Sequence, residues 1–415
     1  MKQPLSPAPV ASIRCGQFVD VVNADVKTNV LLTLDGDRIV DVQDNSTAAL
    51  AADGLDLSDY TVAPGLIDLH AHLVGAEESG SYGDILMASQ ADDALIGVKN
   101  ARSTIDVGFT TVRDVGSFRA FTDVSLRKAI NAGWVVGPRM HCSGGYVTCT
   151  GGGGEVTGFA ADVQVPETMR VGVSDNADEV RKAVRRFMAG GADFIKVIAT
   201  GAVLAPGTNP GASEFSEAEI RAAVEEAALY GTVVAAHAHG AEGIKRATRA
   251  GVRSIEHGSF ADDEALALMA ERGTYLVADV WAGDWMQDEG EKEEWPAETM
   301  RKIIDTTETQ RDAFRRALKL GVRIGFGTDS GIYPHGMNIH QLPKMVELGL
   351  SPINAIRSAT LWASQCLGSG EVGALEVGRY ADLVAVGAQD IGDLSCFVTD
   401  MRTVVKGGVV VRSND

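Results

Sequence analysis

The sequence predicts an α/β protein: a (β/α)8 barrel joined to a small domain to which both chain ends contribute strands. Three observations lead to this fold class. Short apolar segments alternate with helical segments through the middle of the chain, as in parallel sheets built from βα units. Several of these apolar segments end in a polar residue, which is where such barrels carry their active sites. Both chain ends contain short segments that alternate apolar and polar residues.

The two chain ends share one pattern. In residues 11–60, apolar and polar residues alternate in short runs around a hairpin signal at Asp35-Gly36. Residues 372–415 show the same alternation around a Gly-Gly turn. Neither end has enough strand to form a sheet alone, whereas the two together do.

The barrel strands follow from the apolar segments of the central region. The helical segments between them include residues 179–189, 216–230 and 262–271. Ser216 with Glu219 three residues later is typical of a helix N-terminus, because the hydroxyl and the acid cap free backbone amides. The expected barrel strands are residues 64–70, 109–114, 138–143, 193–198, 232–237, 252–257, 274–279 and 322–328.

A His-X-His pair, His70 and His72, closes the first barrel strand. Side chains two residues apart on a strand point to the same side, so the two imidazoles emerge together from a rigid support. Imidazole is a favoured ligand of zinc and its neighbours. Two solvent-facing histidines at a strand end are the plain alternative for this pair taken alone.

Four later strands carry one polar residue each at or near the C-terminal end. These residues are Lys196, His237, His257 and Asp329. Lys196 stands among isoleucine and valine, where loss of hydration lowers the pKa of an amine. A neutral amine can add carbon dioxide and become a carbamate, an anionic ligand with two oxygens. The plain alternative is a lysine that reaches solvent from the strand end or pairs with a carboxylate.

The order His-X-His, Lys, His, His, Asp resembles the binuclear metal signature of the amidohydrolase superfamily. The nearest resemblance is to the prolidase-like enzymes and the carboxypeptidases that act on Xaa-Arg/Lys or Xaa-hydrophobic dipeptides, a branch related to imidazolonepropionases. The resemblance implies that the small domain is a composite β-sandwich of residues 1–63 and 371–415, beside a barrel of residues 64–370. The matching segments are residues 64–72, 108–114, 235–240, 254–258, 325–336 and 381–384.

The resemblance also implies a metal centre and a reaction. Carbon dioxide or bicarbonate would carbamylate Lys196, and a hydroxide bridging two Zn²⁺ ions would attack the scissile carbonyl. Asp329 would be the catalytic residue that takes the proton and passes it to the leaving amine. The implied ligands are His70, His72 and Asp329 for one ion and His237 and His257 for the other, with Lys196 between them.

Contacts to the substrate are less firmly indicated. His239 stands where relatives place a His or Tyr that contacts the substrate carbonyl, and a packing role is the alternative. Relatives often have Thr-Gly-Gly-His after the third strand, but this chain has glycine at position 153. His141, near the end of that strand, is a candidate replacement or else a core histidine. Asp284 and Glu289 lie in an acidic, tryptophan-containing segment that would accept a basic or a hydrophobic C-terminal residue, or would simply be solvated.

Composition narrows the function classes. The chain has 415 residues, which suits a barrel with an accessory domain, and a net charge of −19. That charge argues against nucleic acid and anionic membranes as partners, because both favour basic surfaces. Five scattered cysteines, the lack of an apolar run of membrane-spanning length and the lack of a secretory signal predict a cytoplasmic protein with reduced thiols. We expect a homo-oligomer that acts on small molecules.

Three functions compete at this stage. The first is a binuclear zinc hydrolase that cleaves dipeptides or N-acyl amino acids. The second is an imidazolonepropionase-like hydrolase of a cyclic amide, or a deaminase, with one metal; such relatives do not need the lysine, so Lys196 argues against it. The third is a non-enzymatic assembly protein, which the six filled ligand positions make the weakest.

Overall fold

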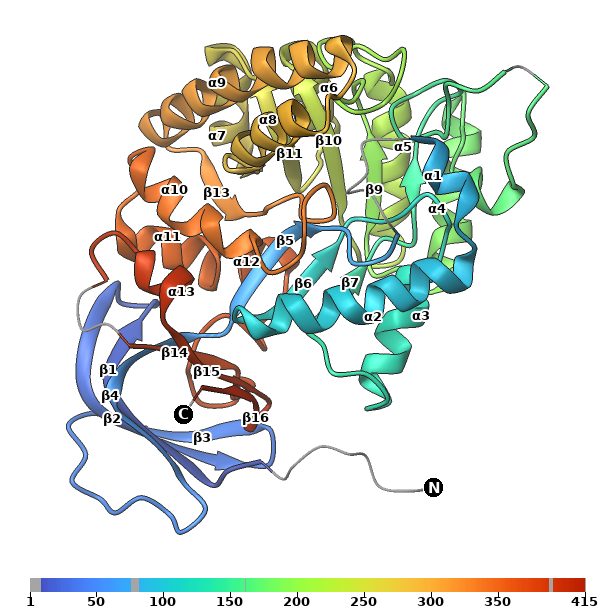
Figure 1. Cartoon of the computed structure of the whole chain (residues 1–415). Coiled ribbons are helices and arrows are strands. Elements are labelled where there is room, and N and C mark those ends of the chain that lie inside the picture. The colour runs from blue at the N-terminus through green and yellow to red at the C-terminus, as the bar shows by residue number, and fades with distance from the viewer. Residues whose placement is uncertain (1–8, 76–81, 161, 388–390, 415) are drawn as a thin grey trace.

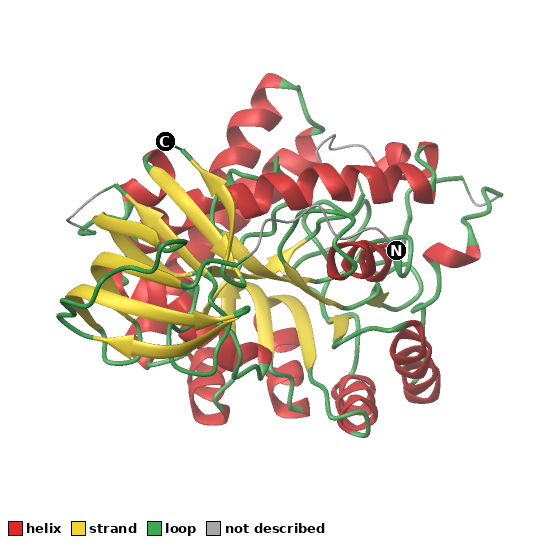
Figure 2. Ribbon diagram, turned by 90° about the horizontal axis from the view of Figure 1, so that it is seen from below, coloured by secondary structure: helices red, strands yellow, loops and turns green. Residues whose placement is uncertain are grey.

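A (β/α)8 barrel with a curved sheet beside it makes up the computed structural model, which describes residues 9–75, 82–160, 162–387 and 391–414 (Figures 1 and 2). All eight expected barrel strands are present, which confirms the predicted fold class. They are β5 (Leu66–Ala71), β6 (Phe109–Asp114), β7 (Arg139–Cys142), β9 (Ile195–Ile198), β10 (Val234–Gly240), β11 (Ser254–Phe260), β12 (Tyr275–Ala278) and β13 (Arg323–Phe326).

Parallel pairing closes the barrel. Strands β5, β6 and β7 pair in chain order, and a second sheet runs from β13 to β9 and on to the two-residue strand β8 (Tyr146–Val147). An isolated parallel β-bridge between Ala71, at the end of β5, and Ser330, after β13, joins the two sheets. Strands β5, β6, β9 and β12 are buried along their whole length, because helices cover the outside and side chains fill the inside.

Helices surround the barrel (Figure 2). Ser216 and Glu219 form the expected capping box at the start of α5. The segment that follows β12 is a helix, α8, whereas the sequence suggested an acidic loop. The helices are α1 (Tyr82–Met87), α2 (Gln90–Asp106), α3 (Thr122–Asn131), α4 (Ala177–Gly190), α5 (Glu217–Ala228), α6 (Ala241–Ala250), α7 (Asp263–Arg272), α8 (Ala282–Lys292), α9 (Ala297–Leu320), α10 (Gln341–Glu347), α11 (Pro352–Ser358), α12 (Leu361–Leu367) and α13 (Ser395–Thr399), with 3-10 turns η1 (Glu167–Met169) and η2 (Asn338–His340).

The composite domain is one seven-stranded sheet drawn from both chain ends, in the order β16-β15-β14-β4-β1-β2-β3. The two ends meet where β14 pairs antiparallel with β4. Both expected tight turns are present, and Gly407 and Gly408 have φ values of +57° and +73°, which glycine adopts without strain. The strands are β1 (Ser12–Asp20), β2 (Asp25–Asp35), β3 (Arg38–Gln43), β4 (Leu55–Pro64), β14 (Leu383–Val386), β15 (Met401–Lys406) and β16 (Val409–Ser413).

Two contacts fix this sheet to the barrel. Only Gly65 separates β4 from β5, and a Cβ there would lie 2.2 Å from the Thr110 hydroxyl oxygen, so the close approach requires glycine. The Tyr380 ring lies between the guanidinium groups of Arg38 and Arg139, at 3.5 and 3.6 Å. Such stacking adds to the apolar packing of the junction.

No helix in the described part of the chain is long and apolar enough to cross a membrane. The cysteines at positions 15, 142, 149, 366 and 396 are all free thiols, in line with the absence of a disulfide framework.

The capping box at α5 generates a stability prediction. Ser216→Ala removes the hydroxyl that accepts the Glu219 amide, so it should lower the free energy of unfolding by about 1 kcal/mol. Chemical denaturation measures this value. Ser216→Asp is the matched control, because aspartate also caps helices, and an equal loss in both variants would contradict the capping account.

Candidate active site

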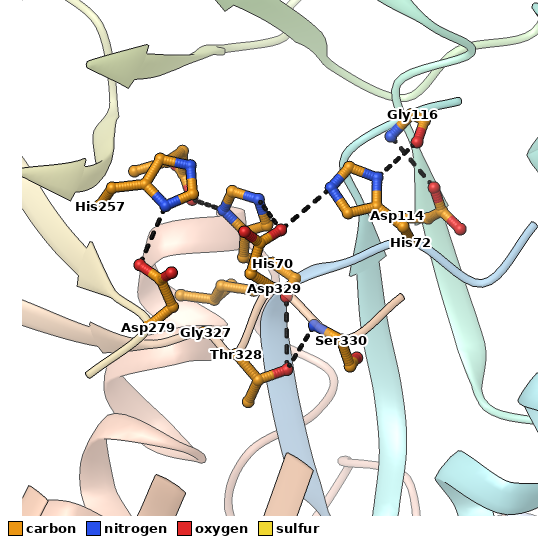
Figure 3. Close-up of polar contacts among 12 residues, drawn as sticks. His70, His72, Asp114, Gly116, His257, Asp279, Gly327, Thr328, Asp329 and Ser330 are labelled. Carbon is orange, nitrogen blue, oxygen red and sulfur yellow. Dashed lines mark hydrogen bonds and ion pairs between the residues drawn. The ribbon is translucent and has the colours of Figure 1, made fainter. Parts of the chain in front are cut away.

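Six side chains of the expected metal centre converge at the C-terminal mouth of the barrel (Figure 3 labels His70, His72, His257 and Asp329). The ligand atoms of His70, His72 and Asp329 lie within 4.8 Å of one another, as do those of His237, His239 and His257. The structure therefore brings together every residue that the sequence proposed as a ligand. All six are nearly inaccessible, at 2–8% exposure: His70, His72, Lys196, His237, His257 and Asp329.

A buried ionic chain orients His70. Its Nδ1 lies 2.9 Å from a Glu256 oxygen, and the other carboxylate oxygen of Glu256 accepts from Arg113 at 2.8 Å. Burial alone would raise the pKa of Glu256, but Arg113 and His70 lower it further than burial raises it, so this carboxylate is ionised. The His70 Nδ1–H is thereby held as a donor, and Nε2 faces Asp329 at 3.2 Å.

His72 converges on the same carboxylate oxygen. Its Nδ1 lies 2.7 Å from the backbone oxygen of Gly116, and its Nε2 lies 3.2 Å from Asp329 Oδ1 (Figure 3). Asp329 and His257 both have positive φ values, +57° and +69°, which cost non-glycine residues about 1–3 kcal/mol each. Strained backbone of this kind concentrates at functional sites, where neighbouring structure holds it in place.

The second group of candidate metal-binding side chains is three histidines in mutual ring contact, His237, His239 and His257. His237 Nε2 lies 3.2 Å from the Gly201 oxygen, which leaves Nδ1 as the atom available to a metal. His239 Nδ1 lies 2.8 Å from the Ser259 hydroxyl, and its ring stacks on His257 at 4.7 Å. Burial, and then the neighbouring histidines, hold the pKa of His237 well below its ordinary value. The neutral imidazole that results is the form that binds metals.

Lys196 lines the same cavity as the two groups of candidate ligands. Its Nζ is buried and has no hydrogen-bond partner among the residues that the structure describes. Burial lowers the pKa of this amine to about 8, with Glu256 and Asp329 opposing the shift. An unpaired buried ammonium is costly, whereas a neutral amine that gains carbon dioxide becomes a carbamate able to bind cations. The donor set and the orphaned amine together fit a divalent metal centre.

Asp279 is a functional residue that the sequence reasoning missed. It directly follows β12, and its Oδ1 accepts from His257 Nδ1 at 2.9 Å and from the Gln310 amide at 2.7 Å (Figure 3). It thereby fixes which nitrogen of His257 carries the proton and leaves Nε2 for a metal. The signal was available, because Asp279 is the polar residue at the end of the seventh strand, as in the other ligand strands.

The ligands form the floor of a cavity of about 150 Å³ whose upper walls are mainly apolar. No arginine lines the cavity among the described residues, and Lys196 is the one lysine there. The apolar side chains of the walls are Ile85, Phe118, Ile198, Ala202, Val203, Leu204, Ala205, Met286 and Ile332.

Comparison with known proteins shows the family of the chain. Residues 61–412 match the family described as "Amidohydrolase family". The chain belongs to this family. A curated relative, "Ochratoxinase" from Aspergillus niger, is 33% identical over 356 residues, 80% of this chain and 72% of its own. The amidohydrolase is also 32% identical over 182 residues, 42% of the chain and 38% of the relative, to "Imidazolonepropionase" from Symbiobacterium thermophilum.

Two solved structures are similar over almost the full length of the amidohydrolase. One is "a Xaa-Pro dipeptidase with bound methionine in the active site", with 36% identity and a TM-score of 0.91, covering 97% of this chain and 99% of that chain. The other is a "prolidase" complexed with "n-methylphosphonate-l-proline", with 30% identity, a TM-score of 0.89 and the same coverage. The expected fold and the expectation of a metal-dependent hydrolytic enzyme are thereby confirmed.

Three residues proposed for substrate contact do not line the described cavity. His141 lies half-buried on β7, in the electric field of Asp193 and Arg113. Asp284 pairs with Arg311 at 2.5 Å and Lys344 at 3.1 Å, so its charge is already balanced. Glu289 pairs with Lys292.

The two acids lie on α8. In α8, Gly283 and Met286 line the cavity, whereas Asp284 pairs with Arg311 and Lys344, and Glu289 lies nearer the end of the helix and pairs with Lys292. The two carboxylates predicted to accept a basic C-terminal residue therefore lie outside the cavity lining. The tryptophans at 281, 285 and 295 pack with Tyr333 in a separate apolar cluster.

Gly153, at the position where relatives often carry a histidine, does line the cavity. A Cβ at this position would lie 3.0 Å from the Cβ and the backbone nitrogen of Ala202. The loop after β9 therefore closes the space next to the glycine, and His141, the candidate replacement for the absent histidine, lies outside the cavity lining.

The contact between Asp279 and His257 generates a metal-binding prediction. Asp279→Ala should lower metal affinity about 10–100-fold, the usual effect of removing the partner of a metal-bound histidine. Competition with a chromogenic chelator measures the affinity. Asp284→Ala, on the neighbouring helix but outside the cavity, should match the wild type. Equal affinity in all three proteins would contradict the assignment.

Proposed function

We propose that this amidohydrolase is a binuclear zinc enzyme that cleaves the amide bond of dipeptides or N-acyl amino acids whose C-terminal residue is hydrophobic. The observation that carries the proposal is Lys196, a buried amine with no hydrogen-bond partner among the described residues, which lines the same cavity as the five other proposed ligands. A one-metal site has no use for this amine. Carbon dioxide would add to the neutral amine with release of a proton, or bicarbonate would react with it with loss of water. The resulting carbamate would be an anionic ligand for metal ions held by the other five side chains.

Zn²⁺ ions bound here would polarise the scissile carbonyl and lower the pKa of the attacking water. The ligands proposed for them are His70, His72 and Asp329 on one side and His237 and His257 on the other, with Lys196 between.

Asp329 is proposed as the proton carrier. Burial alone would raise its pKa, but the charge and hydrogen bond of His70 and the hydrogen bond of His72 hold the pKa well below the ordinary value, so the carboxylate is ionised, the form that a proton acceptor needs. It takes the proton released by the water and delivers it to the leaving amine. His239, whose Nδ1 is occupied by Ser259, presents Nε2 to the substrate carbonyl.

The preference for a hydrophobic C-terminal residue follows from the cavity walls. Val203, Leu204 and Met286 offer no partner to a charged side chain, while burial of a leucine- or phenylalanine-sized group gains about 1.5–3 kcal/mol. The relatives support this class of substrate, since one is named a Xaa-Pro dipeptidase, one a prolidase and one an ochratoxinase.

An imidazolonepropionase-like hydrolysis of a cyclic amide with one metal is the second candidate. It is favoured by the similarity to imidazolonepropionase over 42% of the chain, and Lys196 argues against it. The number of metal ions per chain, measured by inductively coupled plasma mass spectrometry, separates the two.

Lys196→Ala tests the proposed centre. The variant should lose most bound metal and activity, because the bridging ligand is gone, and acetate or propionate should restore part of both. Metal content and turnover of an Xaa-Leu dipeptide provide the measurements. Lys182→Ala, an exposed lysine on α4, is the control. Full metal content and activity in Lys196→Ala would refute a role for this lysine.

Asp329→Asn tests the proton transfer. The amide retains a metal-binding oxygen but cannot carry the proton, so kcat should fall about 10²-fold or more while much of the metal stays bound. Steady-state kinetics at saturating substrate measure kcat. Turnover close to that of the wild type would show that another group moves the proton.

A dipeptide library tests the substrate class. With Zn²⁺ added, kcat/KM should be higher for Xaa-Leu, Xaa-Met and Xaa-Phe than for Xaa-Arg and Xaa-Lys by about tenfold or more, the value of one apolar side chain buried. Asp284→Lys should leave this ratio unchanged, because Asp284 is outside the cavity. A preference for Xaa-Arg that this variant abolishes would contradict the apolar-wall account.

A further inference from the structure

A carboxylate that belongs to none of the ligand groups connects two segments of the cavity wall. The Gly153 backbone amide donates to both oxygens of Glu214, at 3.0 and 2.9 Å. The backbone amide of Glu214 donates to the oxygen of Ala199 at 2.9 Å, just beyond β9. Glu214 therefore ties the glycine run, residues 151–154, to the segment that follows β9.

Both of the segments that Glu214 connects line the cavity. The glycine run contributes Gly153 and Gly154, and the loop after β9 contributes residues 202–205. The two segments approach closely: a Cβ on Gly152 would lie 2.7 Å from a Glu214 oxygen. Close packing explains why this part of the run is glycine.

The charge of Glu214 is not balanced by a cation. None of the ion pairs of the described residues includes this carboxylate, and burial raises its pKa to about 7, against the opposing effect of the Gly153 amide. An ionised carboxylate in this position costs folding free energy, whereas a glutamine would accept from Gly153 without that cost. A residue that opposes stability beside a cavity is typical of a functional constraint.

We propose that Glu214 is a positioning residue that holds the glycine run against the loop of residues 201–205 and so sets the shape of the apolar wall that receives the substrate side chain. This inference rests on the proposed function for its substrate and extends it to specificity. Glu214 lines neither the cavity nor the metal centre among the described residues, so it acts through Gly153. Its loss should change KM for bulky apolar substrates and leave metal content and kcat in place.

The experiment compares Glu214→Ala and Glu214→Gln with Glu225→Gln, an exposed carboxylate on α5, in the zinc-loaded enzyme at pH 8. For a dipeptide with C-terminal phenylalanine, Glu214→Ala should raise KM about tenfold, the loss of one charge-assisted hydrogen bond, with kcat and bound zinc within about twofold. Glu214→Gln keeps one acceptor for the Gly153 amide, so its KM should lie between those of the wild type and Glu214→Ala. Its melting temperature should equal or exceed that of the wild type. Glu225→Gln should behave as the wild type.

Hydrogen exchange gives a second measurement that needs no activity. The amides of residues 151–154 should exchange about tenfold faster in Glu214→Ala than in the wild type, in metal-free and zinc-loaded protein alike. Unchanged exchange together with unchanged KM would overturn the proposal. A fall in kcat and zinc content at constant KM would also overturn it, because Glu214 would then act on the ligands. If the wild type hydrolyses no dipeptide, the proposed function fails, and the exchange result still decides whether Glu214 holds the wall.

Discussion

The arrangement of the site depends on one constraint: a buried amine must be neutral, paired or chemically modified, because an isolated ammonium is too costly in an apolar interior. Lys196 has no partner among the described residues, although two carboxylates, Glu256 and Asp329, stand nearby. Both carboxylates are already engaged, Glu256 by Arg113 and His70, and Asp329 by His70 and His72. Neither carboxylate is therefore free to pair with the amine. A carbamate on this amine would be an anion and would complete the ligands of a cationic metal centre.

The barrel supplies the rigidity that this centre requires. Each candidate ligand stands on, or just after, a barrel strand that is buried along most of its length. Irregularities in strand pairing lie next to two of the histidines. The pairing of β5 shifts between Asp68 and Ala71, around His70, and that of β10 shifts between Ala238 and Gly240, around His239. Bulges of this kind are frequent beside active sites, where they redirect a side chain. Asp279 and Glu256 then fix the histidine rings by hydrogen bonds from behind.

Strand ends were predictable from the sequence, and side-chain directions were not. Apolar segments that end in His70, His237, His257 and Asp329 were enough to place these residues at one mouth, because parallel barrel strands all end there. The same rule reaches Asp279, the polar residue that directly follows the seventh barrel strand. The directions of His141, Asp284 and Glu289 depend on the rotation of β7 and on α8 being helical, neither of which composition specifies. The role of Glu214 depends on a contact across 61 residues of sequence, which no local pattern contains.

The central claim is that Lys196 carries a carbamate that joins two metal ions. Carbon-13 nuclear magnetic resonance of zinc-loaded protein prepared with ¹³C-bicarbonate tests it most directly. The account predicts a carbonyl signal from one labelled carbamate per chain when two zinc ions are bound. The signal should be lost in Lys196→Ala. Fully loaded, active protein without a carbamate signal would contradict the account.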